Sequence, residues 1–335
     1  MLSFLKKQWF VLALFLGVIT AFQFPEMGAD GGPLRPEVTI NIGIVLVFFI
    51  QGWMLPTEVL AKGMLRMKAH LFTQLFVFLL FPMVIIVGDV FWGGGMSDSL
   101  RYGFFFLSAL PTTITSAVIY ASQSDGSVPV ALINTTISNV AGILITPVWM
   151  LMLAKAGGGE MGELGGVLMK LTKLIVLPLI VGQAFHVVWK GVVKRVKTIA
   201  GYFNHLVILF IVFTVFANSV IGGAWEGQGQ GIVLHTLGIC LLVFVLVTVF
   251  CFVLLSLTKF PRDEQVAVYF CGTQKTLAAG VPLGISLFGE DPSFGLILLP
   301  LILYHLLQLI VGAFLFEPLK RFVARGTDES HGMGA

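Results

Sequence analysis

The sequence predicts an all-α integral membrane protein with ten transmembrane helices, and three observations support this. Of the 335 residues, 57% are hydrophobic and 11% are charged, whereas a soluble domain carries roughly 25% charged residues. The apolar runs reach the length of about 20 residues that a helix needs to cross a bilayer. They lack the alternating polarity of transmembrane β-strands, which excludes a membrane barrel.

Ten candidate spans follow when the chain is divided at charged residues and at Gly or Pro clusters. They cover residues 8–24, 38–55, 69–88, 101–121, 127–154, 167–189, 201–221, 231–257, 265–288 and 293–316. The first run resembles the apolar part of a signal peptide. It lacks a small-residue cleavage site before Phe22 and Phe24, so we expect a first span there.

The distribution of charge predicts an orientation and excludes one class of partner. Most of the 20 Lys and Arg residues fall in segments that are cytoplasmic if the N-terminus is inside. We therefore expect a multi-pass protein of the bacterial inner (plasma) membrane with both termini in the cytoplasm. The net charge of +3 is scattered over short loops, so no nucleic-acid partner is expected.

Two interrupted spans indicate an internal repeat. Span four contains the run Leu110-Pro111-Thr112-Thr113-Ile114-Thr115-Ser116, and span nine contains a polar, Gly- and Pro-interrupted run over residues 271–282. Ser116 and Lys275 are 159 residues apart, as are the starts of spans one and six at 8 and 167. Because five spans is an odd number, the second half enters the membrane in the opposite sense, as in transporters with inverted repeats.

The domain boundaries follow from this repeat. We expect a first repeat over residues 1–155, a second over 166–318 and a cytoplasmic tail over 319–335. Lipid cannot satisfy the backbone groups that a broken helix exposes, so matched breaks imply a polar cavity between packed helices. Half-helix N-termini attract anions there, and unwound carbonyls attract cations. The alternative is that Gly and Pro only kink packed helices.

Lys275 is the one charged residue deep in a predicted span. A charge at that depth costs at least about 2.5–3.5 kcal/mol, so it needs a reason. Its ammonium could hold an anionic substrate or occupy a cation site of the transport cycle. A structurally paired lysine is the alternative, and proton coupling stays open because an enclosed lysine can exchange its proton.

Polar side chains of span five suggest an ion site. Thr135, Ser138 and Asn139 lie at i, i+3 and i+4, on one helical face. Hydroxyl and amide oxygens are ligands for hard cations such as Na⁺, although Ser and Thr also join membrane helices without binding ions. Gln74 can equally be a packed polar residue or a ligand, whereas a histidine such as His305 is more often packed and hydrogen-bonded than a ligand. We expect no cofactor beyond a coupling ion, and no enzyme, because no P-loop, HExxH or GxSxG pattern is present.

The sequence resembles the bile acid:sodium symporter superfamily, in its SBF-like sodium-dependent transporter branch. Residues 125–147 (DGSVPVALINTTISNVAGILITP) are similar to the family's fifth span, and Ser116 and Gln274 match residues of its two crossed, discontinuous helices. The resemblance implies a core domain of spans three to five and eight to ten that rocks against a panel domain of spans one, two, six and seven. It also implies an organic anion, such as a bile acid or small carboxylate, that moves with two sodium ions.

The polar residues of the spans and the resemblance together predict the following site residues. The predicted Na⁺ ligands are Ser116, Thr135, Ser138 and Gln274. The wider set of predicted ion-binding residues adds Asn139, Thr273 and Gln74. The predicted substrate-binding residues are Thr112, Thr113, Asn134, Lys275, Thr276 and His305.

Departures from the family pattern lie at span nine. Phe270 stands where sodium-coupled members carry a glutamate, Ala117 stands where an asparagine is usual, and Lys275 follows Gln274. A nearby ammonium opposes a sodium ion electrostatically, so our hypothesis is that Lys275 replaces at least one sodium. The favoured function is organic-anion symport by alternating access. The alternatives are a proton-coupled transporter and a non-transporting regulator or sensor; substrate identity and oligomeric state stay open.

Overall fold

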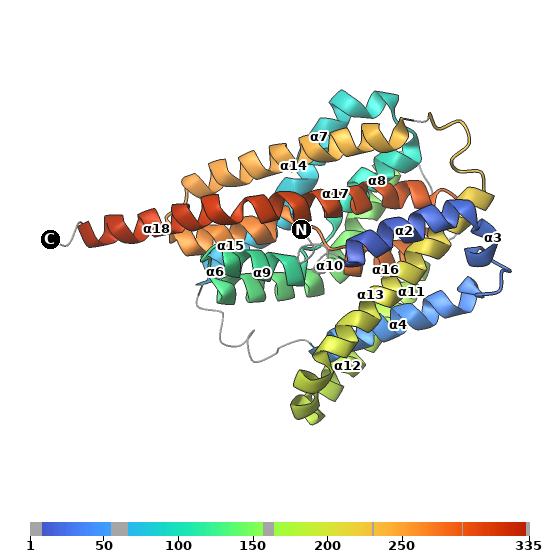
Figure 1. Ribbon diagram of the computed structural model, residues 1–335, viewed down its shortest axis with the longest axis horizontal. Coiled ribbons are helices and arrows are strands. Elements are labelled where there is room, and N and C mark those ends of the chain that lie inside the picture. The colour runs from blue at the N-terminus through green and yellow to red at the C-terminus, as the bar shows by residue number, and fades with distance from the viewer. Residues whose placement is uncertain (1–8, 55–65, 157–163, 230, 290, 333–335) are drawn as a thin grey trace. The chain divides into compact units, whose positions relative to one another are not determined.

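The structure is a computed structural model that describes residues 9–54, 66–156, 164–229, 231–289 and 291–332. All regular elements within these ranges are helical (Figure 1). Seven helices are long and apolar enough to cross a membrane, or eight if the bent pair α8 (Asp98–Ala109) and α9 (Ile114–Gln123) counts as one span. The all-α membrane class is confirmed, while the count of ten spans stays a prediction.

Besides the bent pair, two more predicted spans are not formed by one long helix. The first contains α2 (Trp9–Gln23), which is apolar but only 15 residues long. The ninth is divided between α15 (Arg262–Thr273) and α16 (Leu277–Phe288). Lys6, Lys7 and Lys62, which contribute to the predicted orientation, lie outside the described residues.

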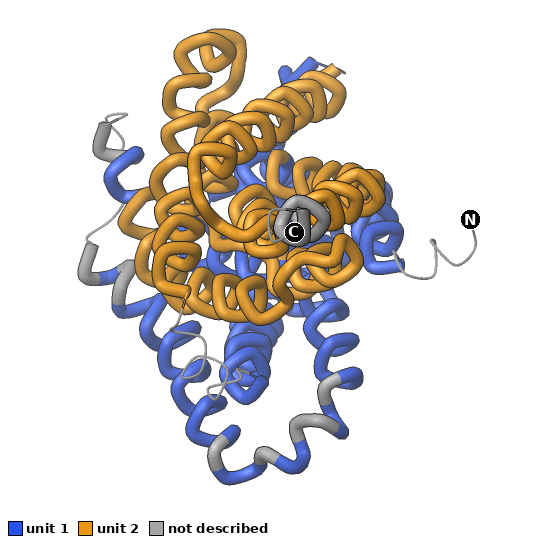
Figure 2. The backbone as a smooth tube through the Cα atoms, turned by 90° about the vertical axis from the view of Figure 1, so that its left-hand side faces the viewer, with its two compact units in different colours: residues 1–55, 151–230, 278–299 blue, residues 56–150, 231–277, 300–335 orange. Residues whose placement is uncertain are grey.

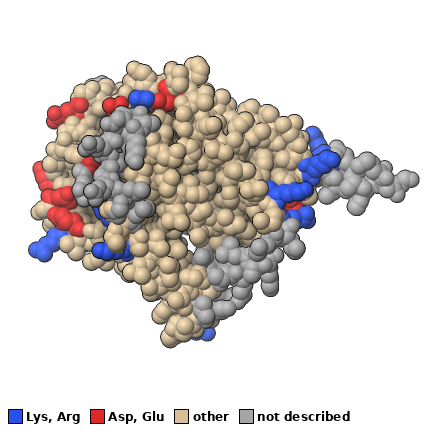
Figure 3. Space-filling model, turned by 180° about the vertical axis from the view of Figure 1, so that it is seen from behind, with Lys and Arg blue, Asp and Glu red and all other residues tan. Residues whose placement is uncertain are grey.

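The surface carries many large apolar side chains that are mostly exposed. Phe91 is 82% exposed, Phe314 78% and Leu257 77%. On the face in Figure 3, most of the visible surface has no charged side chain. Exposed apolar surface of this extent marks contact with a membrane or a partner, and together with the apolar helices it indicates a multi-pass membrane protein.

The chain divides into two compact units (Figure 2). Unit 1 comprises residues 1–55, 151–230 and 278–299. Unit 2 comprises residues 56–150, 231–277 and 300–335. The helices α10 (Val128–Ala156), α16 and α17 (Phe294–Phe314) each contribute residues to both units.

Unit 1 is built on close helix contacts. Besides α2 it contains α3 (Pro25–Gly28), α4 (Pro36–Met54), α11 (Leu164–Leu171), the π-helical turn η4 (Thr172–Val176), α12 (Leu177–Val188) and α13 (Lys190–Ile221). Gly52 of α4 lies against the backbone of Leu179, and Gly182 of α12 lies against the backbone of Phe49. Small residues permit such approaches between membrane helices.

Replacing Gly52 with alanine is expected to destabilise the protein. The added Cβ would meet the carbonyl oxygen of Leu179, a backbone atom that cannot rotate away, and such overpacking costs about 1–3 kcal/mol. Gly17→Ala is the matched control, because nothing lies within 4 Å of its added Cβ and alanine favours the helix by about 1 kcal/mol. Thermal unfolding of the detergent-solubilised variants measures both; equal losses would contradict the packing argument.

Unit 2 holds the break residues of both interrupted spans, 110–113 and 274–276. Its elements are α6 (Met67–Leu75), the π-helical turn η2 (Phe76–Leu80), α7 (Phe81–Trp92), the 3₁₀ turn η3 (Gly93–Gly95), α8 (Asp98–Ala109), α9 (Ile114–Gln123), α14 (Ile232–Ser256), α15, α18 (Phe316–Gly332) and most of α10 and α17.

The turn η2 frees backbone carbonyls inside unit 2. The N–H of Phe81 bonds to the carbonyl of Phe76 rather than to that of Val77. Pro82 has no N–H to offer Val77 in the wider π register or Phe78 in the α register. The carbonyl of Phe78 accepts the Trp149 indole N–H at 2.7 Å, and that of Val77 has a partner described below.

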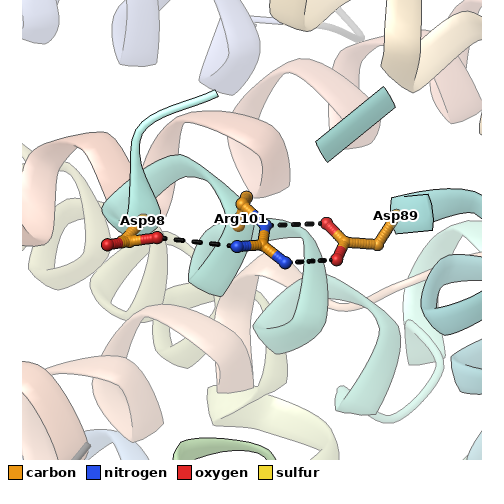
Figure 4. A network of polar contacts seen from close by, with 3 residues as sticks. All are labelled: Asp89, Asp98 and Arg101. Atoms are coloured by element: carbon orange, nitrogen blue, oxygen red, sulfur yellow. Dashed lines mark hydrogen bonds and ion pairs between the residues drawn. The ribbon is translucent and has the colours of Figure 1, made fainter. Parts of the chain in front are cut away.

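An ion network joins α7 to α8 (Figure 4). The Arg101 Nε donates to Asp89 Oδ1 at 3.0 Å, and a second guanidinium nitrogen reaches the other carboxylate oxygen. Asp98 is more distant, at 3.6 Å from the guanidinium, and its side chain is 86% exposed. The bidentate pair therefore closes the α7–α8 hairpin.

Arg101→Met is expected to destabilise the protein by roughly 1 kcal/mol, the upper end of the range for accessible ion pairs, because Asp89 loses both bonds. Asp98→Asn should change the free energy of unfolding by a few tenths of a kcal/mol at most, because the Asp98–Arg101 contact is longer and solvated. Chemical unfolding in detergent measures both, and an Asp98 effect as large as the Arg101 effect would contradict this assignment.

Candidate functional site

The first interruption separates α8 from α9 by residues 110–113, with a bend of 56° between the two helices. Pro111 causes it, because proline cannot donate into the helix and disfavours helical geometry in the residue before it. Two residues of α10 hold the unwound backbone. Ser138 Oγ accepts the N–H of Thr112 at 3.1 Å, and Asn139 Nδ2 donates to the carbonyl of Thr112 at 2.8 Å.

The second interruption separates α15 from α16 by residues 274–276. Two buried residues of α17, four positions apart, hold it. Tyr304 donates its hydroxyl to the carbonyl of Thr273 at 2.8 Å. Gln308 accepts the N–H of Lys275 at 2.7 Å and donates to the Lys275 carbonyl at 2.8 Å. Sequence analysis missed Gln308, whose signal is its spacing of four and three residues from Tyr304 and His305 in a mostly apolar helix.

The two interruptions are in direct contact. The N–H of Thr276 donates to the carbonyl of Pro111 at 3.0 Å. Ser116 Oγ, in the first turn of α9, donates to Gln274 Oε1 at 2.7 Å. The two helix breaks that the sequence indicated therefore meet, and one backbone hydrogen bond joins their unwound segments.

Lys275 is fully buried, with 0% exposure. Its Nζ donates to the carbonyl of Val77 at 3.0 Å, of Ser108 at 2.7 Å and of Leu110 at 2.8 Å. The Nζ also lies 4.2 Å from the centre of the Phe81 ring, within the range of a cation–π contact.

All five carbonyls from residue 108 to 112 have a protein donor. Lys275 Nζ serves Ser108 and Leu110, and Thr146 Oγ1 donates to Ala109 at 2.7 Å. Those of Pro111 and Thr112 are bonded to Thr276 and Asn139 as described above. Such complete pairing is what a break at membrane depth requires.

The predicted ion-site residues of span five form hydrogen bonds within the protein, and their binding of an ion stays a prediction. Ser138 and Asn139 bind Thr112, whereas the hydroxyl of Thr135 donates to Leu132 of its own helix at 3.0 Å. The carbonyl and Oδ1 of Asn134, one helical turn before Ser138, accept Gln74 Nε2 at 3.2 and 3.3 Å.

Two oxygens of this region are buried without a hydrogen-bond partner among the described residues. They are Gln74 Oε1 and Thr112 Oγ1. Thr112 itself is 0% exposed. Oxygens of this kind are suitable ligands for a hard cation.

The remaining predicted residues surround the two breaks. Thr113 precedes α9 and is buried, as are Thr276 and His305. His305 Nδ1 lies 2.8 Å from Gln308 Nε2, so it accepts that amide proton. The Thr273 hydroxyl donates to Tyr269 within α15 at 2.8 Å.

Phe270 is also enclosed, with its ring 5.6 Å from that of Tyr120. Phe270 therefore makes an aromatic contact at the position where the resemblance implies a glutamate in sodium-coupled members.

The comparisons with known proteins cover nearly the whole chain. A family model described as the SBF-like CPA transporter family matches residues 8–321. The sodium/bile acid cotransporter 7 of Xenopus tropicalis is 30% identical over 333 residues, covering 96% of this chain and 94% of the relative. The protein of the same name from Rattus norvegicus is 28% identical over 333 residues, covering 96% and 95%. An uncharacterized protein of Pseudomonas aeruginosa is 32% identical over 313 residues, covering 93% and 92%.

Proposed function

Because the chain belongs to the SBF-like CPA transporter family, we propose that it is a sodium-coupled symporter that moves an organic anion by alternating access. One observation carries this proposal: two interrupted helices meet through Ser116 and Gln274 inside unit 2. Interrupted helices with polar contacts are the usual binding apparatus of secondary transporters. The relatives named for sodium and bile acid transport support the same class.

The proposed architecture has ten spans in two inverted repeats, residues 1–155 and 166–318, followed by a tail over 319–335. Its panel domain comprises spans one, two, six and seven, and its core domain spans three to five and eight to ten. The compact units support this division, because α2, α4, α12 and α13 belong to unit 1. The inner membrane and cytoplasmic termini are part of the proposal.

The proposed sodium ligands are Ser116, Thr135, Ser138 and Gln274, with Asn139, Thr273 and Gln74 around them. The unpaired oxygens Gln74 Oε1 and Thr112 Oγ1 support a cation in this region. The proposed substrate contacts are Thr112, Thr113, Asn134, Thr276 and His305. The α9 N-terminus, which has no side-chain cap, supports an anion there because its amides form the positive end of the helix dipole.

For Lys275 we propose the cation role rather than direct contact with substrate. Three carbonyls already use the three N–H groups of its ammonium. Phe270 supplies no negative charge where the family has a glutamate. A positive charge has been added and a negative charge removed, so we propose a lower sodium stoichiometry than the two ions of classical members.

Uptake by proteoliposomes tests the function. Labelled bile acids and small carboxylates are offered under an inward Na⁺ gradient, an inward proton gradient, or K⁺ alone. We expect accumulation with Na⁺ only, abolished when an ionophore collapses the gradient. Accumulation driven by protons alone would overturn sodium coupling. If no anion is accumulated, and neither Na⁺ nor any anion of the panel raises the unfolding temperature, the transporter assignment fails and a regulator is favoured.

A further inference from the structure

The bonds of Lys275 indicate that its side chain is bound as a cation. An ammonium has three N–H donors, whereas a neutral amine has two. Three carbonyl oxygens lie 2.7, 2.8 and 3.0 Å from Nζ. The face of the Phe81 ring completes the surroundings at 4.2 Å, and aromatic faces attract positive charge.

Two of these carbonyls come from the end of α8. Ser108 and Leu110 flank Ala109, the last residue of α8. The N–H that would serve Ser108 in a continued helix belongs to Thr112 and goes to Ser138 instead. The C-terminal end of a helix carries partial negative charge, which favours a cation.

The third carbonyl, that of Val77, is supplied by the π turn. In the α register its donor would be Phe81, whose N–H is bonded to Phe76. In the π register its donor would be Pro82, which has no N–H. Phe81, the first residue of α7, directly follows this turn and places its ring beside the ammonium. The turn η2 and the residue after it therefore contribute two of the four groups around Nζ.

These groups are neutral, and they belong to elements other than the one that carries the lysine. We propose that Val77 O, Ser108 O, Leu110 O and the Phe81 ring form a monovalent-cation site whose occupant is the chain's own ammonium. When the side chain is shortened, a free primary alkylammonium ion binds in its place. The consequence for transport, one sodium fewer per cycle, rests on the proposed function; the site itself does not.

Chemical rescue of Lys275→Ala tests the site. The n-propylammonium ion supplies the three carbons and the ammonium that this substitution removes, and tetramethylammonium carries the same charge without any N–H. Thermal unfolding of the full-length protein in detergent is the readout. We expect Lys275→Ala to unfold at a lower temperature than wild type and saturating propylammonium to recover at least half of that loss. Tetramethylammonium should recover none of it, and the wild type should not respond.

Lys275→Met is the matched control, because its side chain fills the apolar part of the space and leaves no room for propylammonium. Equal rescue of both variants, rescue by tetramethylammonium, or no rescue of Lys275→Ala would overturn the proposal.

If Lys275→Ala does not fold, a double-mutant cycle between Phe81 and Lys275 tests the cation site instead. Phe81→Leu should lower the unfolding temperature more in the wild-type background than in Lys275→Met, because the ring contacts a cation only in the former. Equal losses in the two backgrounds would overturn the site. These measurements do not involve transport, so an absence of sodium-driven uptake would refute the proposed function and leave the cation site standing.

Discussion

Gln308→Met is expected to lower the free energy of unfolding by about 1–3 kcal/mol, because it leaves the buried N–H of Lys275 without a partner. The carbonyl of Lys275 would keep only its 3.5 Å contact with His305 Nδ1. The amide of Gln308 is 0% exposed and bonds to the N–H and the carbonyl of Lys275. Methionine keeps the length and volume of the side chain, so the loss reports hydrogen bonding rather than a cavity. Reversible unfolding of the detergent-solubilised protein measures it.

Gln183→Met is the control for this prediction. Both polar atoms of the Gln183 side chain are buried without a hydrogen-bond partner among the described residues. Replacing an unsatisfied amide with an apolar group of similar shape is close to neutral or stabilising. If Gln308→Met proved as harmless as Gln183→Met, the second break would not depend on α17.

Gln274→Leu is expected to raise the sodium concentration for half-maximal uptake about tenfold or more, because it removes a buried oxygen from the proposed sodium ligands; a loss of about 1.4 kcal/mol corresponds to a factor of ten. Ser116→Ala should act in the same direction, since its hydroxyl bonds to Gln274 Oε1 at 2.7 Å. Initial rates in proteoliposomes across a sodium series provide the measurement.

Ser124→Ala is the matched control for Ser116→Ala. Ser124 follows α9, is 0% exposed, and its hydroxyl has no hydrogen-bond partner among the described residues. Its loss should leave the sodium dependence unchanged. A Ser116→Ala variant with wild-type sodium dependence would remove the hydroxyl from the proposed site, and a shift in Ser124→Ala of equal size would indicate a general effect on folding.

The helix breaks were predictable because they depend on local chemistry. Pro111 and the threonines beside it cannot continue an apolar helix, and a break of this kind is visible in one segment of sequence. Lys275 was equally conspicuous as a charge in an apolar span. Both features were found at the expected residues, and the structure adds that the two breaks touch.

The partners of Lys275 were not predictable in the same way. Val77 carries no polar side chain, and its carbonyl becomes available only because η2 adopts a π register before Pro82. Backbone carbonyls are present at each residue, so a sequence does not indicate which of them are left unpaired. Gln308 was missed for a related reason, since one amide in span ten has no meaning until α17 lies beside the second break.

The sequence by itself determined the membrane class, the helical content, the positions of the two interruptions and the family, because hydropathy, proline and motif spacing are local properties of the chain. Only the tertiary structure decided that the ammonium of Lys275 is enclosed by three carbonyls and an aromatic ring. Residue 275 is distant in sequence from residues 77, 108 and 110, and its hydrogen bonds to them exist only once the helices have packed.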